Sequence, residues 1–159
     1  LMGPSANVPD AAALAEAQAL FLKFYADNVS HSQPYPGVVA GLEAMQKAGY
    51  RLACVTNKPA SFTLPLLQAS QLDSYFSVVV SGDSLSKKKP DPAQLLHVCE
   101  QFQLAPEQAL MVGDSISDVT AARAAGCYVF TVPYGYNHGL VLQSDASIAQ
   151  LGDTLTLLH

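Results

Sequence analysis

Three polar clusters in this sequence carry side chains of the kinds that handle phosphate esters: Thr56-Asn57, Lys89, and the pair Asp114 and Asp118. A hydroxyl or amide group can hold phosphate oxygens, and a lysine offsets their charge as a point cation. Two carboxylates four residues apart can recruit Mg²⁺, which prefers oxygen ligands and keeps several of its waters. These residue types favour phosphoryl chemistry with a hard metal ion, provided that the fold brings them together.

Each cluster taken alone also has a plainer explanation. Asp118 can simply stabilise the positive end of a helix if it lies in the first helical turn. Four of the eight lysines and arginines are Lys58 and the run Lys87 to Lys89, which two solvated basic loops explain equally well. The spacing Gly-Asp-x-x-x-Asp is a weak signal by itself, so the elements around the clusters must decide.

Those elements alternate between strand and helix. Short apolar runs predict strands over residues 52–55, 78–80, 109–112 and 128–132, and helical spacing predicts helices over residues 10–29, 36–48, 61–70, 90–102 and 115–126. Short connections between them predict a parallel α/β sheet with helices on both faces. In such a sheet ligands bind beyond the carboxyl ends of the strands. We therefore expect the three polar clusters to meet at one edge.

Composition limits the class of protein. The 159 residues are 50% hydrophobic and only 13% charged, which favours one well-packed core over disorder. A net charge of −5 argues against nucleic acid as a partner, and no apolar run is long enough to span a membrane. No secretory signal is visible. The scattered cysteines Cys54, Cys99 and Cys127 are typical of reduced thiols, so we expect a cytoplasmic protein.

In this setting the clusters resemble motifs of the haloacid dehalogenase-like superfamily. Val55-Thr56-Asn57 is similar to its second motif, Lys89-Pro90 to its third, and Gly113 to Asp118 to its fourth. Ser117 departs from the pattern, because related phosphatases often have asparagine there. Over residues 34–151 the chain is most similar to the bacterial phosphoglycolate phosphatases of this superfamily. The resemblance implies a Rossmann-like α/β core.

The resemblance also implies roles for individual residues. Thr56, Asn57 and Lys89 would bind the transferred phosphoryl group, and Thr56 and Lys89 would take part in catalysis. Asp114 would bind Mg²⁺, with Asp118 coordinating beside it or acting through water. The partner of such a site is a small phosphorylated substrate, with no nucleic acid and no membrane involved.

One part of the superfamily pattern does not occur in this sequence. The first motif, Asp-x-Asp-Gly-Thr on the central strand, supplies the attacking aspartate and a general acid/base. Before Pro34 the only aspartates are Asp10 and Asp27. By resemblance, residues 1–33 would be the end of a helical cap domain and residues 34–159 a core without its first strand. We expect this chain alone to be inactive, and an N-terminal segment or a second chain to complete the sheet.

Three function classes remain open. The first is a Mg²⁺-dependent phosphatase that cleaves a small phosphomonoester, 2-phosphoglycolate above others, through an aspartyl-phosphate. The second is a sugar-phosphate phosphatase, a mutase or a dehalogenase, although dehalogenases of the superfamily work without the metal that Asp114 and Asp118 favour. The third is a non-catalytic module.

Four residues in the loop after the fourth strand can be rim or packing residues: Tyr134, Tyr136, Asn137 and His138.

Overall fold

The computed structural model describes Ala12, Glu16, Leu20, residues 32–136, Gly139 and residues 141–158. Its contacts divide the chain into two compact units, Leu1–Ser32 and Gln33–His159. The helix predicted over residues 10–29 lies outside the described residues, except that Ala12, Glu16 and Leu20 are helical. The fold below is that of the second unit.

The strands of the second unit are all parallel and form two small sheets. β1 (Ala53–Val55) pairs with β2 (Val78–Val80), β3 (Leu110–Gly113) pairs with β4 (Tyr128–Thr131), and β4 pairs with β5 (Ala146–Ser147). Among the described residues β1 and β3 do not pair with each other. The strands that lead to Thr56 and Asp114 therefore stay in separate sheets, in a core that the resemblance implied to lack its first strand.

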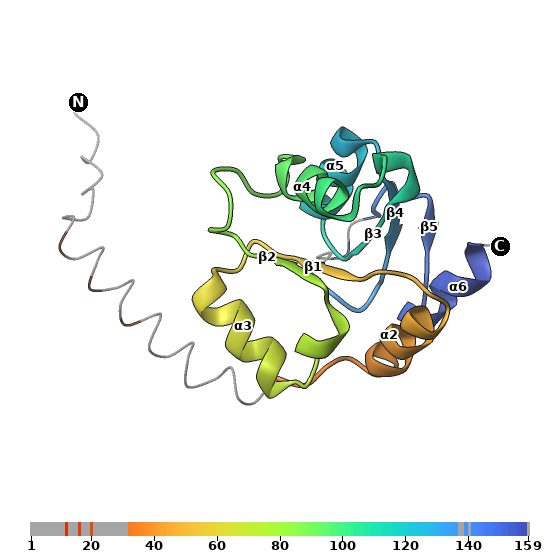
Figure 1. Ribbon diagram of the computed structural model, residues 1–159, viewed down its shortest axis with the longest axis horizontal. Coiled ribbons are helices and arrows are strands. Elements are labelled where there is room, and N and C mark those ends of the chain that lie inside the picture. The colour runs from red at the N-terminus through yellow and green to blue at the C-terminus, as the bar shows by residue number, and fades with distance from the viewer. Residues whose placement is uncertain are drawn as a thin grey trace, which may run out of the picture. The chain divides into compact units, whose positions relative to one another are not determined.

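Helices cover both faces of these strands, as predicted. The helices are α2 (Val38–Lys47), α3 (Ala60–Ala69), α4 (Ala93–Phe102), α5 (Ile116–Ala125) and α6 (Thr154–Leu157). Three 3₁₀ turns join them, at Asp73–Tyr75, Pro106–Gln108 and Leu151–Asp153. α4 and α5 lie together on one side of the strands, and α2, α3 and α6 lie on the other (Figure 1). The α/β class with parallel strands is confirmed.

Glycines follow the last turns of two of the helices. Gly49 (φ 88°) follows the last turn of α2, and Gly126 (φ 82°) caps α5, both in the left-handed region that glycine adopts without a Cβ penalty. The start of α2 differs, because the helix begins at Val38 and not at Pro36. Pro65 lies in the second turn of α3, deeper than expected for a residue without an N–H.

The largest core cluster lies between α4, α5 and the strands. Its buried members are Leu95, Cys99, Val119, Ala121, Ala122, Ala125, Cys127 and Val129. Ala121 and Ala122 are completely buried, so the small side chains of α5 let this helix lie close against β3 and β4. Val55 of β1 and Met111 of β3 pack against the same cluster. A shared core therefore holds the two sheets together although their strands do not pair.

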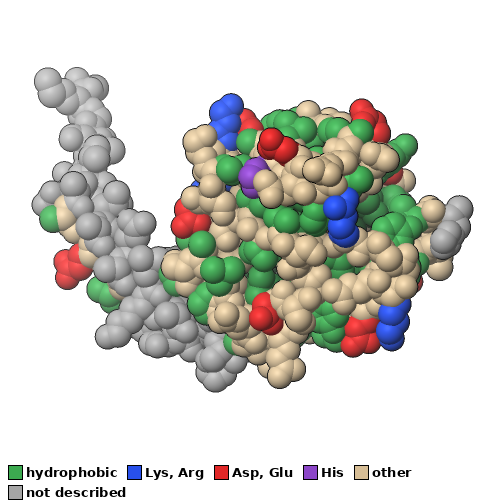
Figure 2. All heavy atoms as spheres, in the orientation of Figure 1, with side chains coloured by type: hydrophobic (Ala, Val, Ile, Leu, Met, Phe, Trp, Pro, Cys, Tyr) green, Lys and Arg blue, Asp and Glu red, His purple; other side chains and the backbone are tan. Residues whose placement is uncertain are grey.

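The described surface mixes apolar, polar and charged groups. On the face shown in Figure 2, the Lys and Arg side chains stand apart from one another, some of them beside acidic side chains. None of the described helices is both long enough and apolar enough to cross a membrane.

Candidate active site

Thr56 and Asn57 leave the carboxyl end of β1 and are held there by hydrogen bonds. The Thr56 N–H donates to the Val80 carbonyl at 2.9 Å, which extends the β1–β2 ladder by one residue. The Thr56 hydroxyl accepts the Lys58 N–H at 3.1 Å and so closes a tight turn. The Asn57 amide donates to the Lys89 carbonyl at 2.7 Å. These contacts bring the loop after β1 against the lysine-rich loop.

The Asn57 amide also contains a buried atom whose hydrogen-bonding capacity is unused. Its Oδ1 is buried and has no hydrogen-bond partner among the described residues. Leaving a buried acceptor unsatisfied costs about 1–3 kcal/mol, so such atoms often face a place where a donor binds. This oxygen lies on the loop predicted to hold phosphate.

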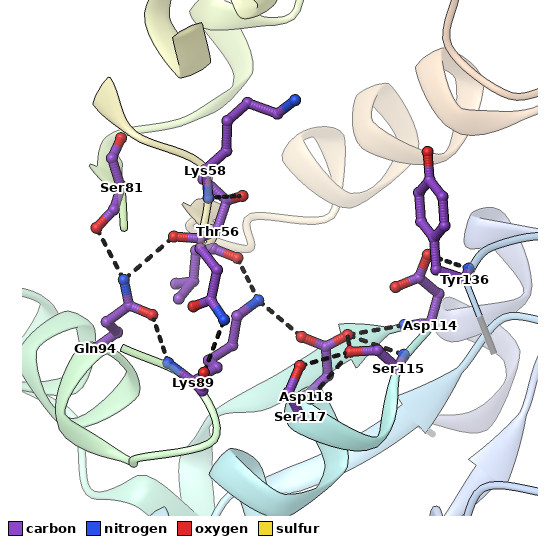
Figure 3. A network of polar contacts seen from close by, with 12 residues as sticks. Thr56, Lys58, Ser81, Lys89, Gln94, Asp114, Ser115, Ser117, Asp118 and Tyr136 are labelled. Atoms are coloured by element: carbon purple, nitrogen blue, oxygen red, sulfur yellow. Dashed lines mark hydrogen bonds and ion pairs between the residues drawn. The ribbon is translucent and has the colours of Figure 1, made fainter. Parts of the chain in front are cut away.

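Lys89 is the member of the lysine run that enters the site. Its Nζ donates to the Val55 carbonyl at 2.8 Å and to Asp118 Oδ1 at 2.7 Å, and the residue is only 8% exposed. Lys87 and Lys88 are exposed, and Lys87 pairs with Asp91 at the surface. Figure 3 shows the Lys89 ammonium between the end of β1 and the start of α5. The lysine therefore links two loops that belong to separate sheets.

Both oxygens of Asp118 are already engaged. Oδ1 binds Lys89, while Oδ2 accepts the backbone N–H groups of Asp114 and Ser115 at 3.1 and 3.0 Å and the Ser115 hydroxyl at 2.7 Å. Burial alone would raise the pKa of Asp118, but the Lys89 charge and these hydrogen bonds outweigh it and hold the pKa below its ordinary value. Asp118 thus anchors Lys89 and the loop that carries Asp114.

Asp114 directly follows β3, and its carboxylate has a different hydrogen-bond partner from that of Asp118. Its Oδ2 accepts the Tyr136 N–H at 2.8 Å, and Figure 3 shows this carboxylate directed toward the loop after β4 while Asp118 is directed toward Lys89. None of the ion pairs among the described residues includes Asp114. The two aspartates of the fourth motif therefore have separate sets of hydrogen-bond partners.

The donors at Asp114 fit Mg²⁺ in part. No group of three His, Cys, Asp or Glu side chains among the described residues lies close enough together to enclose a metal ion. Mg²⁺ is commonly bound by one or two carboxylates with waters and substrate phosphate, which does not require a complete protein cage. Asp114 offers the hard oxygen ligand that such a site needs from this chain.

The loop after β4 lies against Asp114. A Cβ at Gly135 would lie 1.9 Å from Asp114 Oδ2 and 2.2 Å from Asp114 Cβ, so the loop approaches this closely only because residue 135 is glycine. The Tyr134 ring lies 5.0 Å from that of Tyr35, and burial together with Asp114 raises the pKa of Tyr134. The Tyr136 ring is 74% exposed. Asn137 and His138 lie outside the described residues.

Three contributors to this site escaped the sequence analysis. Ser115 caps α5 and pairs with Asp118 in the Ser-x-x-Asp pattern of a capping box, a signal that the sequence contains. Gly135 is visible only as a turn residue, because its contact with Asp114 joins two separate loops. Gln94, whose side chain hydrogen-bonds to the backbone of Thr56, Ser81 and Lys89, is not indicated by the sequence. A glutamine at the start of a helix is ordinarily exposed.

An α/β fold with a threonine, a buried lysine and aspartates at its strand ends defines a class of phosphate-handling hydrolase. Residues 6–132 match the haloacid dehalogenase-like hydrolase family, and the chain belongs to it. The phosphoglycolate phosphatase of Nitrosospira multiformis is 49% identical over 100% of this chain and 72% of its own length.

Solved structures agree with this assignment. A predicted phosphoglycolate phosphatase from Haemophilus somnus superposes with a TM-score of 0.90 at 36% identity, over 95% of this chain and 69% of the other. A putative beta-phosphoglucomutase from Thermotoga maritima gives a TM-score of 0.79 at 29% identity, over 96% and 71%. The resemblance noted in the sequence is therefore confirmed at the level of family and fold.

Proposed function

We propose that this chain forms most of a Mg²⁺-dependent phosphatase that hydrolyses a small phosphomonoester, with 2-phosphoglycolate as its substrate. The observation that carries the proposal is the buried Lys89–Asp118 pair, which joins the end of β1 to the loop that carries Asp114. Relatives such as the 49% identical Nitrosospira multiformis protein are phosphoglycolate phosphatases, which supports the choice of substrate.

The described residues have distinct roles in this proposal. Thr56 and Asn57 hold the oxygens of the transferred phosphoryl group at the end of β1, and the Lys89 ammonium offsets the charge that these oxygens carry. Asp118 keeps the ammonium in place through the 2.7 Å contact with Oδ1. Mg²⁺, when bound, neutralises phosphate charge and fixes the orientation of the ester, and Asp114 is the residue that would hold it.

The nucleophile is proposed to come from a segment outside these 159 residues. Covalent phosphoryl transfer requires an attacking carboxylate in line with phosphorus, and the sequence contains no Asp-x-Asp-Gly-Thr motif. β1 and β3 do not pair with each other, and the strand that carries the aspartate is proposed to pair between them and bring it to the same edge. The orphaned Asn57 Oδ1 lies at that edge and would gain a donor.

Two expectations from the sequence stand as parts of the same proposal. Residues 1–33 are proposed to be the end of a helical cap domain, which would select the substrate. The protein is proposed to work in the cytoplasm, since Cys54, Cys99 and Cys127 are all free thiols.

A sugar-phosphate mutase is the second candidate, because of the similarity to the putative beta-phosphoglucomutase. The two activities differ in their products. A phosphatase releases inorganic phosphate, whereas a mutase returns an isomer of the sugar phosphate with no phosphate released.

Complementation tests the proposal. The 159-residue chain would be assayed alone, and again with a polypeptide carrying the first motif of the Nitrosospira multiformis phosphatase, each with Mg²⁺ and 2-phosphoglycolate. We expect phosphate release only from the complemented protein, and none when the motif's first aspartate is changed to asparagine. Release of phosphate by the chain alone, in a preparation shown by mass to contain no second polypeptide, would refute the assignment of the nucleophile. A complemented protein that isomerises glucose 1-phosphate and releases no phosphate would favour the mutase.

A further inference from the structure

Gln94, in the first turn of α4, is completely buried although its side chain is polar. Its Nε2 donates to the Ser81 carbonyl at 2.9 Å and to the Thr56 carbonyl at 3.2 Å, and its Oε1 accepts the Lys89 N–H at 3.2 Å. These partners belong to three separate loops: the ends of β1 and β2 and the start of the Lys89–Pro90 segment. Figure 3 shows the amide reaching toward all three.

In these contacts the Gln94 amide donates both of its hydrogens and accepts with its oxygen, so each of its polar atoms has a hydrogen-bond partner. A buried amide with all three bonds made fixes its neighbours, because any shift leaves a buried polar group unpaired. The backbone of Lys89 is in fact held at both polar groups, with its N–H on Gln94 and its carbonyl on the Asn57 amide. The direction in which the Lys89 side chain leaves the loop is set by these two bonds.

We infer that Gln94 is a positioning residue for the phosphate site: it sets the distance between Thr56 at the end of β1 and the Lys89 ammonium. The inference rests on the proposed function, since it assumes that Thr56 and Lys89 bind phosphate. It goes beyond that function because the hydrogen bonds of the Gln94 side chain are to backbone groups and Gln94 belongs to none of the three motifs. Phosphate affinity is therefore expected to depend on a residue that does not contact phosphate.

The test compares Gln94→Met with Gln101→Met. Methionine is close to glutamine in length and lacks the amide, and Gln101 is an exposed residue of the same helix, so the second variant controls for the substitution itself. Two quantities would be measured on the 159-residue chain with Mg²⁺ present. One is the exchange rate of the Lys89 backbone amide by NMR, and the other is the dissociation constant of inorganic phosphate by calorimetry.

Gln94→Met is expected to speed exchange at Lys89 and to weaken phosphate binding by about tenfold or more, because small displacements of positioning groups have large effects. The Val129 amide, which lies in the core, should keep its protection, and Gln101→Met should change neither quantity. Faster exchange with unchanged phosphate affinity would show a merely structural role and overturn the inference. Unchanged exchange at Lys89 would overturn it as well.

Two results separate this inference from the proposed function. If the unsubstituted chain bound no phosphate, the phosphate-binding roles proposed for Thr56 and Lys89 would fail and the inference with them, whereas phosphate release by the complemented protein would still test the proposed function. If that chain bound phosphate and Gln94→Met bound it equally well, the inference alone would fail. Should Gln94→Met not fold, the side-chain amide hydrogens of Gln94 in the unsubstituted chain decide the matter. Slow exchange of these hydrogens is expected, and rapid exchange would contradict the contacts on which the inference depends.

Discussion

Asp114 and Asp118 lie four residues apart, yet each faces its own set of partners. Asp118 is saturated by Lys89 and the α5 capping contacts, while Asp114 Oδ2 meets only the Tyr136 N–H among the hydrogen bonds described. The sequence analysis gave Asp114 the metal and placed Asp118 beside it or acting through water, but it did not predict that Asp118 would bind Lys89. The difference between the two aspartates depends on Lys89, which lies 29 residues away along the chain.

Mg²⁺ binding by this chain should depend on the Asp114 carboxylate. A ligand that binds the folded state alone raises the melting temperature, so Mg²⁺ should stabilise the unsubstituted chain. Asp114→Asn should abolish most of this stabilisation, because a neutral amide binds Mg²⁺ weakly. Asp83→Asn, at an exposed residue beyond the end of β2, is the matched control and should keep the effect. An equal Mg²⁺-dependent shift in both variants, measured by thermal unfolding, would contradict the assignment of Asp114.

The three neighbouring lysines should differ sharply. Lys89→Ala leaves the buried Asp118 carboxylate without its cation, which typically destabilises a protein by about 3–5 kcal/mol. Lys87→Ala and Lys88→Ala alter exposed side chains and should change the free energy of unfolding by about 0.5 kcal/mol or less. Urea unfolding of the three variants measures this directly. Equal and mild losses at all three positions would instead support the interpretation of a solvated basic loop.

The absence of a side chain at Gly135 should be necessary for the position of Asp114. Its φ is not in the left-handed region, so alanine there suffers no backbone strain, but the added Cβ would lie 1.9 Å from Asp114 Oδ2 and 2.2 Å from its Cβ. Gly135→Ala should therefore displace Asp114 and weaken Mg²⁺ binding by about tenfold or more, as changes beside metal ligands commonly do. Calorimetric titration with Mg²⁺ is the measurement. An unchanged dissociation constant would show that the Asp114 position is not set by this contact.

At the scale of elements, the sequence was a good guide wherever an element was long or strongly apolar. The four apolar runs correspond to β1, β2, β3 and β4, and four of the predicted helices correspond to α2, α3, α4 and α5. β5 and α6, of two and four residues, were not predicted because segments so short show no periodicity. β5 pairs with β4, and α6 packs on the 3₁₀ turn Leu151–Asp153, which itself packs on α2. The local sequence does not contain this information.

The start of α5 makes stability depend on pH. The pKa of Asp118 lies below its ordinary value in the folded chain, so its contribution to stability is present above about pH 4 and is lost as the pH falls further. Asp145, whose pKa is lowered by the Val129 N–H and then by Arg123, acts in the same direction. Urea midpoints at pH 7 and pH 3 should show a larger gap between the unsubstituted chain and Asp118→Asn at pH 7 than at pH 3. A gap that stays constant would show that ionised Asp118 does not stabilise the fold.

At the scale of the whole molecule, the alternation of strand and helix was enough to predict a parallel α/β fold and the edge where the polar clusters meet. The separation of β1 and β3 into two sheets does not conflict with the sequence analysis, because the resemblance implied a core without its first, central strand. The contacts of Gln94 were not predicted, since they join three loops through one buried side chain.

The central claim is that residues from separate strand ends form one site that binds phosphate together with Mg²⁺. The most direct test is a calorimetric titration of the 159-residue chain with inorganic phosphate at increasing Mg²⁺ concentrations. The account predicts that Mg²⁺ tightens phosphate binding by about tenfold or more, within the range usual for coupled sites, and that Asp114→Asn removes this coupling. The claim would be contradicted if the phosphate affinity did not change with Mg²⁺. It would also be contradicted if Lys89→Ala bound phosphate as tightly as the unsubstituted chain.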